Sequence, residues 1–311
     1  MSQQTHICVG MGGWDLFPFD KVFYPPLPKR GFRKLEYYSQ FFDFVEINAT
    51  FYNASFTPAQ VQRWLSDVSS NKKFIFAVKL FKGFTHSLDA TKIDVVNVHR
   101  LLDILASQEK FGGLLAQFPY SFTNTHERQL YVVRLCKAFA AHPVFVEFRH
   151  NSWNSPLVEK LFTDQGTLLV NVDLPQIKRH MPLTEHCRDE ISYFRMMGRN
   201  VQSWDHPWRL ERDGSHLVSD RYHYLYAQSE LELLAQKILR LKPIPATTFV
   251  VFHNDPQAQS LVNGFQLRRI LNPKERILIP ENLVRAFPVL QEIGTATETG
   301  HSLFDIAKNN P

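Results

Sequence analysis

The sequence predicts an α/β protein: a single (β/α)8 TIM-type barrel, with an irregular sixth crossover and a long loop after the seventh strand. Three observations favour this fold. Eight short apolar runs recur along the 311 residues, segments with helical spacing separate most of them, and polar residues gather where the runs end. Regular alternation of strand and helix is typical of a parallel sheet, and eight such units suffice to close it into a barrel.

The predicted strands are rich in β-branched and aromatic residues, which favour extended structure. Each is bounded by glycine, proline or polar residues, which are typical of turns. In chain order the strands are His6–Trp14, Phe44–Tyr52, Phe74–Phe81, Gly112–Pro119, Val144–His150, Thr167–Asp173, Ile191–Gly198 and Thr247–Asp255.

The predicted helices follow from the spacing of apolar residues and from their start signals. Thr57-Pro58 and Ser155-Pro156 each place a hydroxyl that can cap a helix before a proline in its first turn. The helices are predicted at Thr57–Val68, Ile93–Gln108, Thr125–Ala141, Ser155–Asp164 and Glu230–Leu241.

Two connections break this alternation. Leu174–Glu190, after the sixth strand, contains prolines that disfavour a full-length helix, and Arg199–Arg221, after the seventh, is a polar loop with tryptophans. Long irregular loops are usually functional or mobile, and these two are expected over the barrel mouth. We expect one barrel domain over residues 1–293 and a flexible polar tail over residues 294–311.

The composition limits the class of protein. Hydrophobic residues make up 44% of the chain, enough for one large core, and the net charge of +5 allows an anionic substrate or weak nucleic-acid affinity. Cys8, Cys136 and Cys187 fit neither a disulfide framework nor a paired metal-ligand pattern. Without a signal peptide or a transmembrane run, we expect a cytoplasmic protein with no membrane partner; the oligomeric state stays open.

Polar residues occupy one face of several predicted strands. In the second strand Val45 and Ile47 share one side, and Glu46 and Asn48 share the other. A core gains nothing from collecting ionisable groups on one face, because each must be desolvated, so we expect a site there. The residues selected by this alternation are Glu46, Asn48, Thr50, Lys79, Gln117, Glu147, Arg149, Asn171, Asp173, Arg195 and His253, with Asn254 and Asp255 at the exit of the eighth strand and His86 and Trp153 in loops.

Four of these residues are predicted to be catalytic. Glu46 and Glu147 are expected to act as a general acid and base, with environments that split their pKa values. Lys79 is suited to a Schiff base or to contact with an anion, and His86 to proton transfer. The predicted substrate-binding residues are Asn48, Gln117, Arg149, Trp153, Asp173, Arg195, His253 and Asn254.

A purely structural ionic core is the alternative. It would balance three carboxylates against three basic side chains, although replacing buried ion pairs by apolar groups is often neutral or stabilising. The groups concerned are Glu46, Glu147 and Asp173 with Lys79, Arg149 and Arg195.

A divalent metal is a further alternative. Glu147, Asp173 and His253 have the composition of a metal site, but three basic side chains in the same lumen would repel a cation. The sequence therefore requires no metal or other cofactor.

The preferred function is an enzyme or binding protein for a small anionic metabolite, a phosphorylated sugar or a carboxylate; hydrolase and isomerase both stay open. One alternative is a nucleic-acid binding or processing protein with a basic barrel mouth. Another is a non-catalytic barrel that binds a ligand or a protein. The clusters that could contact a phosphate backbone are Lys29-Arg30, Arg33-Lys34, Lys178-Arg179 and Arg268-Arg269.

The order of the strand-end motifs resembles the YecE-like family, also called domain of unknown function 72. The resemblance runs from about residue 7 to residue 275 and implies a TIM-type barrel, but no activity. Met197, His223 and His253 stand where relatives typically carry histidine, aspartate and asparagine. The matching segments are Gly10–Trp14, Phe23–Pro25, Val45–Tyr52, Phe76–Lys79, Thr85–His86, Ala116–Pro119, Val146–His150, Ser152–Trp153, Phe194–Arg195, Gly198–Asn200, Arg221–Tyr226 and Phe252–Asp255.

Overall fold

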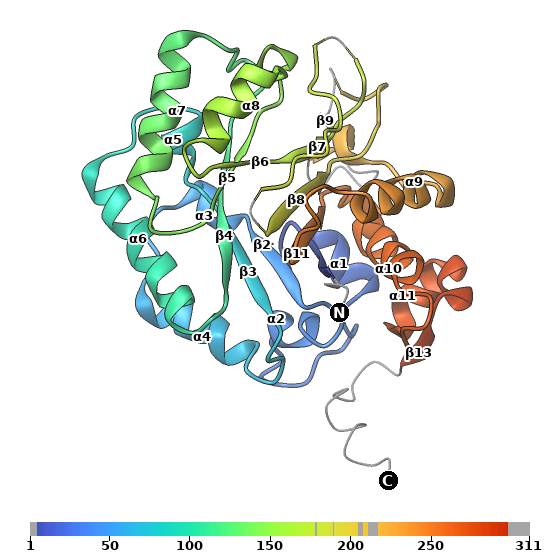
Figure 1. The fold of residues 1–311 in the computed structure, drawn as a ribbon. Helices are drawn as coiled ribbons and strands as arrows, with labels where there is room; N and C mark the ends of the chain where they lie inside the picture. The colour runs from blue at the N-terminus through green and yellow to red at the C-terminus, as the bar shows by residue number, and fades with distance from the viewer. Residues whose placement is uncertain (1–4, 178, 189, 205–207, 211–216, 298–311) are drawn as a thin grey trace.

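The computed structural model describes residues 5–177, 179–188, 190–204, 208–210 and 217–297. Nine of its strands form one parallel sheet in the order β6-β5-β4-β3-β2-β1-β11-β8-β7 (Figure 1). Because β6 and β7 are two parts of the predicted sixth strand, separated by Val170, the sheet closes into the predicted barrel. The strands are β1 (His6–Met11), β2 (Phe44–Ile47), β3 (Ile75–Lys79), β4 (Phe111–Gln117), β5 (Val144–Glu147), β6 (Leu168–Leu169), β7 (Asn171–Asp173), β8 (Ile191–Met196) and β11 (Thr247–Phe252).

The longer helices surround the barrel, with α6 and α7 on one side of the strands in Figure 1 and α9 and α10 on the other. Thr57 and Ser155 cap their helices as predicted, accepting from the backbone N–H groups of Gln60 and Val158. One of these helices, α10, was not predicted; Gln259–Leu267 are all buried, polar residues included, so this stretch has no exposed polar face opposite an apolar stripe. The longer helices are α4 (Pro58–Asp67), α6 (Lys92–Ser107), α7 (His126–Ala138), α8 (Pro156–Thr163), α9 (Gln228–Leu239) and α10 (Gln259–Leu271).

Short helical segments complete the connections. The strand predicted at Phe44–Tyr52 ends at Ile47, because Asn48 adopts helical dihedral angles (φ −86°, ψ −19°) and starts α3. The short segments are α1 (Phe17–Val22), α2 (Lys34–Tyr38), α3 (Ala49–Tyr52), α5 (Lys82–Thr85) and α11 (Glu281–Ala286), and the 3-10 helices Asn151–Trp153, Asp220–Tyr222, Pro256–Ala258 and Pro288–Glu292.

The two irregular connections differ in their structure. Within its described residues the connection after β7 contains no helix, as predicted. It pairs with the segment that follows β5 through an antiparallel bridge between His150 and His180. The connection after β8 is more regular than predicted, because β9 (Trp208–Leu210) and β10 (Leu217–Ser219) pair as antiparallel strands.

The start of the predicted tail is also structured. Thr295–Thr297 form β13, which pairs in parallel with β12 (Leu278–Pro280). Residues 298–311 lie outside the described residues, so the domain boundary at 293 stays a prediction. None of the helices in the described part of the chain is long and apolar enough to cross a membrane.

The barrel lumen is apolar in the part nearer the amino ends of the strands, which we call its lower part. The rings of Phe44 and Phe249 have centroids 4.7 Å apart, and those of Phe145 and Tyr193 are 4.8 Å apart. These side chains belong to an inner cluster that is separate from the layer between barrel and helices. The ionisable groups at the carboxyl ends of the strands therefore lie above an apolar plug.

The packing of this apolar plug predicts different losses of stability for two truncations of apolar side chains. Phe249→Ala should lower the free energy of unfolding by about 3–5 kcal/mol, because it leaves a cavity among packed rings. Leu157→Ala on α8 should change it by less than about 0.5 kcal/mol, because that side chain is 81% exposed. Urea unfolding measures both, and equal losses would contradict the packing of the lumen.

Candidate functional site

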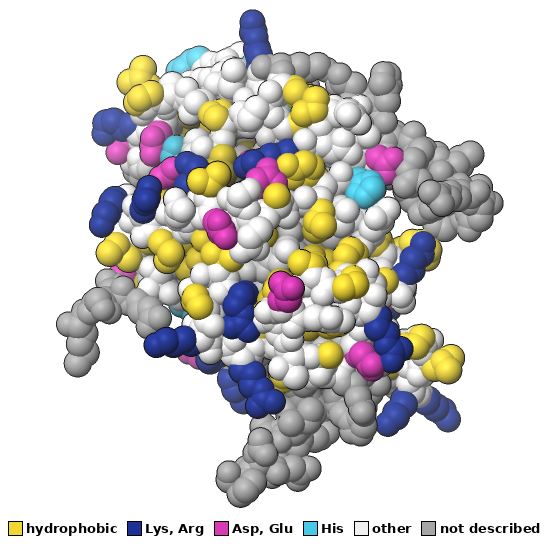
Figure 2. Space-filling view, turned by 90° about the vertical axis from the view of Figure 1, so that its right-hand side faces the viewer, with side chains coloured by type: hydrophobic (Ala, Val, Ile, Leu, Met, Phe, Trp, Pro, Cys, Tyr) yellow, Lys and Arg dark blue, Asp and Glu magenta, His cyan; other side chains and the backbone are white. Residues whose placement is uncertain are grey.

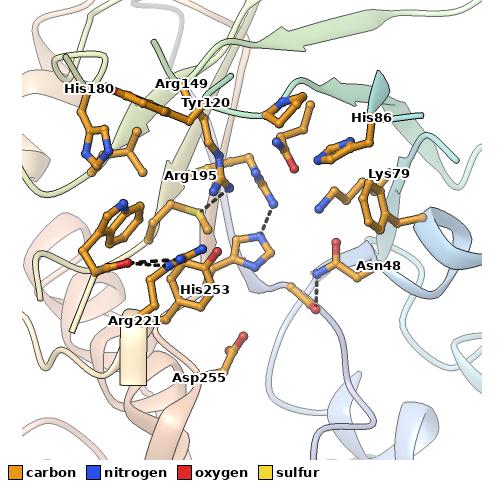
Figure 3. Close-up of a pocket in the computed structure, with 18 of the residues that line it drawn as sticks. Asn48, Lys79, His86, Tyr120, Arg149, His180, Arg195, Arg221, His253 and Asp255 are labelled. Carbon is orange, nitrogen blue, oxygen red and sulfur yellow. Dashed lines mark hydrogen bonds between the residues drawn. The ribbon is translucent and has the colours of Figure 1, made fainter. Parts of the chain in front are cut away.

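A cavity of about 690 Å³ opens at the carboxyl ends of the barrel strands (Figure 3). Strand ends supply Lys79 from β3, Gln117 from β4 and Arg195 from β8, and the residues just after β5 and β11 supply Arg149 and His253. This is the face on which active sites of such barrels form. The alternation of faces therefore located the cavity from the sequence.

Arg195 joins two carboxylates below the cavity. Its Nε and Nη2 donate to Glu46 at 3.0 and 2.9 Å, and its Nη1 donates to Glu147. Both glutamates are 0% exposed. A buried charge is tolerated when it is paired and its hydrogen bonds are satisfied, and one guanidinium does this for two carboxylates from β2 and β5.

Three further groups complete this network. Tyr193 donates its hydroxyl to Glu46 at 2.8 Å, and Arg149 donates Nε to Glu147 at 2.8 Å. Nε2 of His253 lies 2.7 Å from Nη2 of Arg195. Burial and the charge of Arg195 lower the pKa of His253 to about 4, so the imidazole is neutral at pH 7 and can accept from Arg195.

Gly12 leaves room for this imidazole. A Cβ at Gly12 would lie 2.1 Å from the ring of His253 and 2.8 Å from Nδ2 of Asn48. The glycine-rich end of β1 is thus required by close packing at the rim of the cavity.

The network fixes the charge of the glutamates. Burial alone would raise the pKa of Glu46, but the charge of Arg195 holds it well below its ordinary value. Arg195 and Arg149 likewise lower the pKa of Glu147 against the effect of burial. Both carboxylates are therefore ionised and occupied by donors, which does not support the predicted acid–base pair.

Lys79 differs from these groups because it projects into the cavity (Figure 3). Its Nζ lies 4.3 Å from the ring centre of Phe51, and among the described residues no carboxylate is within ion-pair distance of it. Burial and the charge of Arg195 lower the pKa of Lys79 to about 7, with Arg149 acting in the same direction and Glu46 opposing. A substantial fraction of this amine is neutral at pH 7.

His86 and Asn48 lie on the same side of the cavity as Lys79 (Figure 3). Burial and the charge of Lys79 lower the pKa of His86 to about 4, and its Nδ1 lies 2.9 Å from Oγ1 of Thr85. Asn48 donates Nδ2 to the carbonyl of Gly12 at 2.6 Å, while its Oδ1 is buried with no partner among the described residues. The Lys79 side therefore offers a neutral imidazole and a free acceptor.

The wall of the cavity opposite Lys79 was not predicted from the sequence. Tyr120, His180 and Trp204 form a chain of rings with centroids 5.1 Å apart. Arg221 lies over the ring of Trp204 and donates to its carbonyl at 3.1 Å. Most of these residues come from the irregular connections, where tryptophans in long loops were the one available signal. Asp255, which the sequence placed at the exit of the eighth strand, also lines the cavity, and burial raises its pKa to about 7.

Of the predicted site residues, seven line the cavity and two lie just below it. Gln117 donates Nε2 to the carbonyl of Phe118 at 2.7 Å and presents the rest of its amide to the cavity. The lining residues are Asn48, Lys79, His86, Gln117, Arg149, Arg195 and His253, and the two below are Glu46 and Glu147.

Asp173 does not face the site, which corrects the prediction. In the β7–β8 register Val172 lies opposite Arg195, whereas Asp173 lies opposite Met196, whose side chain packs beneath the helices. Asp173 accepts from Arg199 at 2.8 and 3.0 Å and from the hydroxyl of Tyr226 at 2.6 Å. The inner positions of this strand are apolar, so its polar face is the outer one.

Trp153 and Asn254, which were predicted to bind substrate, are held by contacts outside the cavity. The indole of Trp153 stacks on Phe148 at 3.9 Å and donates to the carbonyl of Phe122 at 2.6 Å. Asn254 donates to the carbonyl of Tyr224 and to Oδ1 of Asn263, both at 2.7 Å. Neither side chain lines the cavity.

The residues do not fit the metal alternative. Glu147 is bound by two arginines, and Asp173 lies on the other face of the barrel wall from Glu147 and His253. In the described part of the chain no group of three or more His, Cys, Asp or Glu residues could hold a metal ion.

The position of Lys79 predicts a pH-dependent stability. Its pKa is 10.5 in an unfolded chain and about 7 in the folded one, so the unfolded chain binds more protons between these values. The stability of the native protein should therefore rise from pH 7 to pH 10 through this group. Lys79→Met should raise the melting temperature most at pH 7, and this advantage should shrink towards pH 10.

Thermal unfolding at pH 7, 8, 9 and 10 tests this expectation. Lys82→Met on α5 is the matched control, because Lys82 is exposed. An advantage of Lys79→Met that stays constant from pH 7 to pH 10 would show that the amine is charged in the folded state throughout.

Comparisons with known proteins agree with the fold and the motifs. The family model described as protein of unknown function DUF72 matches residues 8–286. The chain is 28% identical to the UPF0759 protein YunF of Bacillus subtilis (strain 168) in an alignment of length 298 that covers 89% of this chain and 99% of that protein. A crystal structure of a DUF72 family protein from Thermotoga maritima is similar with a TM-score of 0.72 and 27% identity, over 86% of this chain and 99% of the other.

A second crystal structure supports the same fold. A DUF72 family protein from Enterococcus faecalis has a TM-score of 0.71 and 22% identity, over 86% of this chain and 95% of the other. The family model covers most of the chain, and the barrel and its strand-end motifs are those expected from the sequence. The chain therefore belongs to the DUF72 family.

Proposed function

We propose that this protein is an enzyme that acts on a small anionic metabolite, a phosphorylated sugar or a carboxylate, in the cavity at the barrel mouth. The observation that carries the proposal is the charge of the lining. Lys79 and Arg221 face the cavity together with Arg149 and Arg195, which are paired with the glutamates below, whereas Asp255 is the one carboxylate among its described lining residues. A cavity of about 690 Å³ has the size of a small-molecule site.

Arg149 is the group best placed to bind the anion. Its Nε is held by Glu147, which fixes the plane of the guanidinium, and its Nη2 has a weak contact with Sδ of Met197 at 3.9 Å. A carboxylate or phosphate oxygen would replace that contact with a charge-assisted hydrogen bond. The planar fork of arginine matches such groups in two-point contacts.

The glutamates have a positioning role in this proposal. Glu46 and Glu147 hold Arg195 and Arg149 in place and stay ionised. Another side chain must therefore act as the acid or base. Lys79 is suited to this role because its pKa of about 7 allows both protonation states at neutral pH. The neutral His86 beside it is a second acceptor for a proton.

The nucleic-acid alternative loses support from the basic clusters. Arg33 pairs with Asp67 at 2.6 Å, Lys34 pairs with Asp15 at 2.5 Å, and Arg268 pairs with Glu275. On the face that Figure 2 shows, basic side chains are spread among acidic and apolar ones. Lys178 lies outside the described residues. These paired residues do not form a basic stripe that could follow a phosphate backbone.

The cellular setting is part of the proposal. Among the described residues no disulfide joins Cys8, Cys136 or Cys187, which suits a reducing compartment, and we propose the cytoplasm. A non-catalytic binding barrel would use the same cations, but it would not need an unpaired amine inside the cavity.

Binding of simple anions tests the proposal. Inorganic phosphate, glycerol 3-phosphate and citrate should each raise the melting temperature, whereas glycerol should not. Arg149→Met should weaken phosphate binding roughly 10- to 100-fold, since a hydrogen bond to a charged group contributes about 1.5–3 kcal/mol.

Arg100→Met on α6 is the control, because it removes the same charge from an exposed position outside the cavity lining. Circular dichroism establishes that each variant is folded. The proposal fails if no anion stabilises the native protein, or if both variants bind phosphate as well as it does.

A further inference from the structure

We propose that Lys79 forms an imine with the carbonyl carbon of the substrate, which makes the substrate an anionic aldehyde or ketone such as a phosphorylated keto or aldo compound. The inference rests on the proposed function and narrows its substrate class. It concerns the Nζ of Lys79, the Phe51 ring beside it, the acceptor Oδ1 of Asn48 and the anion-binding Arg149.

The sheet fixes the backbone position from which the amine projects. Lys79 is the last residue of β3, which pairs with β2 and β4 on either side. Its carbonyl accepts a hydrogen bond from Oγ1 of Thr50 at 2.6 Å, so the backbone is held at the strand end. A nucleophile on a rigid element meets a bound carbonyl with little loss of conformational freedom.

The amine is available for reaction. Lys34, in contrast, is engaged by Asp15 at 2.5 Å and Asp20 at 2.7 Å, which keep its ammonium charged. Among the described residues Lys79 has no such carboxylate, and its nearest partner is the face of Phe51 at 4.3 Å. The lowered pKa of Lys79, caused by burial and by Arg195, supplies the neutral nucleophile that imine formation needs.

Lys79 is also the one lysine among the described residues that line the cavity. The three cysteines do not compete for the carbonyl, since none of them lines it, and burial raises the pKa of Cys8 to about 12 and of Cys136 to about 11.

The reaction balances without an oxidant or a reductant. The lone pair of Nζ forms a bond to the carbonyl carbon, the π electrons of the C=O bond move to oxygen, and a proton passes from nitrogen to that oxygen, giving a carbinolamine. Proton uptake by the hydroxyl then lets it leave as water, and the nitrogen lone pair forms the C=N bond. The products are one iminium ion and one water molecule.

The surroundings of Nζ suit this iminium. The Phe51 ring face stabilises a cation above it, as it does for the ammonium. Oδ1 of Asn48, which is buried without a partner among the described residues, can accept from the iminium N–H or from the carbinolamine hydroxyl. Arg149 would hold the anionic end of the same molecule across the cavity.

Reductive trapping with pyridoxal 5′-phosphate tests the inference. The full-length protein is treated at pH 7 with this aldehyde or with pyridoxal, which lacks the phosphate, and then with sodium borohydride. Hydride adds to the iminium carbon and leaves a stable secondary amine. Peptide mass spectrometry should place the adduct on Lys79 at least 10-fold ahead of the exposed Lys82, with the phosphorylated probe at least 10-fold ahead of pyridoxal.

Competition by inorganic phosphate and three variants test whether the labelling depends on Lys79 and Arg149. Inorganic phosphate should slow labelling of Lys79, and Arg149→Met should remove most of the preference for the phosphorylated probe. Lys79→Met should lose the cavity adduct while Lys82→Met keeps it. The labelling map of the native protein stands without these variants, should one of them fail to fold.

The outcomes separate the two proposals. If phosphate raises the melting temperature but Lys79 is labelled no faster than Lys82, the imine is excluded and the anion site stands. If Lys79 is labelled equally by both probes and no anion stabilises the protein, the amine is reactive but the anionic substrate is excluded.

Discussion

The bridge from Arg195 to Glu46 and Glu147 is the interaction on which the rest of the site depends. It joins β8 to β2 and β5 across the lumen, with all three side chains at most 1% exposed. Loss of the arginine would leave the buried Glu46 without its counter-ion and Glu147 with Arg149 alone, whereas the intact bridge pairs both carboxylates beneath the cavity. Above the bridge, Arg149 is paired with Glu147 through Nε and still lines the cavity, whereas Lys79 has no carboxylate partner among the described residues.

This arrangement combines two interpretations that the sequence left as alternatives. The charged residues do form a structural ionic core, but only in the layer of Glu46, Glu147 and Arg195. One layer higher, Lys79 and Arg149 face a cavity, and Arg149 is oriented by the glutamate beneath it. The ionic layer lies between the apolar plug and the cavity, so it acts as a rigid base that positions the groups above it.

Much of the fold and about half of the site could be predicted, because both follow from alternation along strands. Glu46, Lys79, Glu147 and Arg195 occupy inner positions as their spacing indicated. The rule failed at Asp173, where we took the polar face as the inner one; its partner Arg199 comes from a connection without periodicity. Residues such as Trp204 reach the cavity from irregular segments, whose course depends on tertiary contacts rather than on a local repeat.

Measuring the pKa values of Glu46 and Glu147 tests most directly whether Arg195 keeps both buried carboxylates ionised. Carbon-13 NMR of the labelled glutamate side chains, followed from pH 7 down to the onset of acid unfolding, reports the protonation of each carboxylate in the folded protein. We predict that both stay ionised over this whole range, because Arg195 and its neighbours favour the charged form. Titration of either carboxylate at or above the ordinary glutamate pKa would contradict the account.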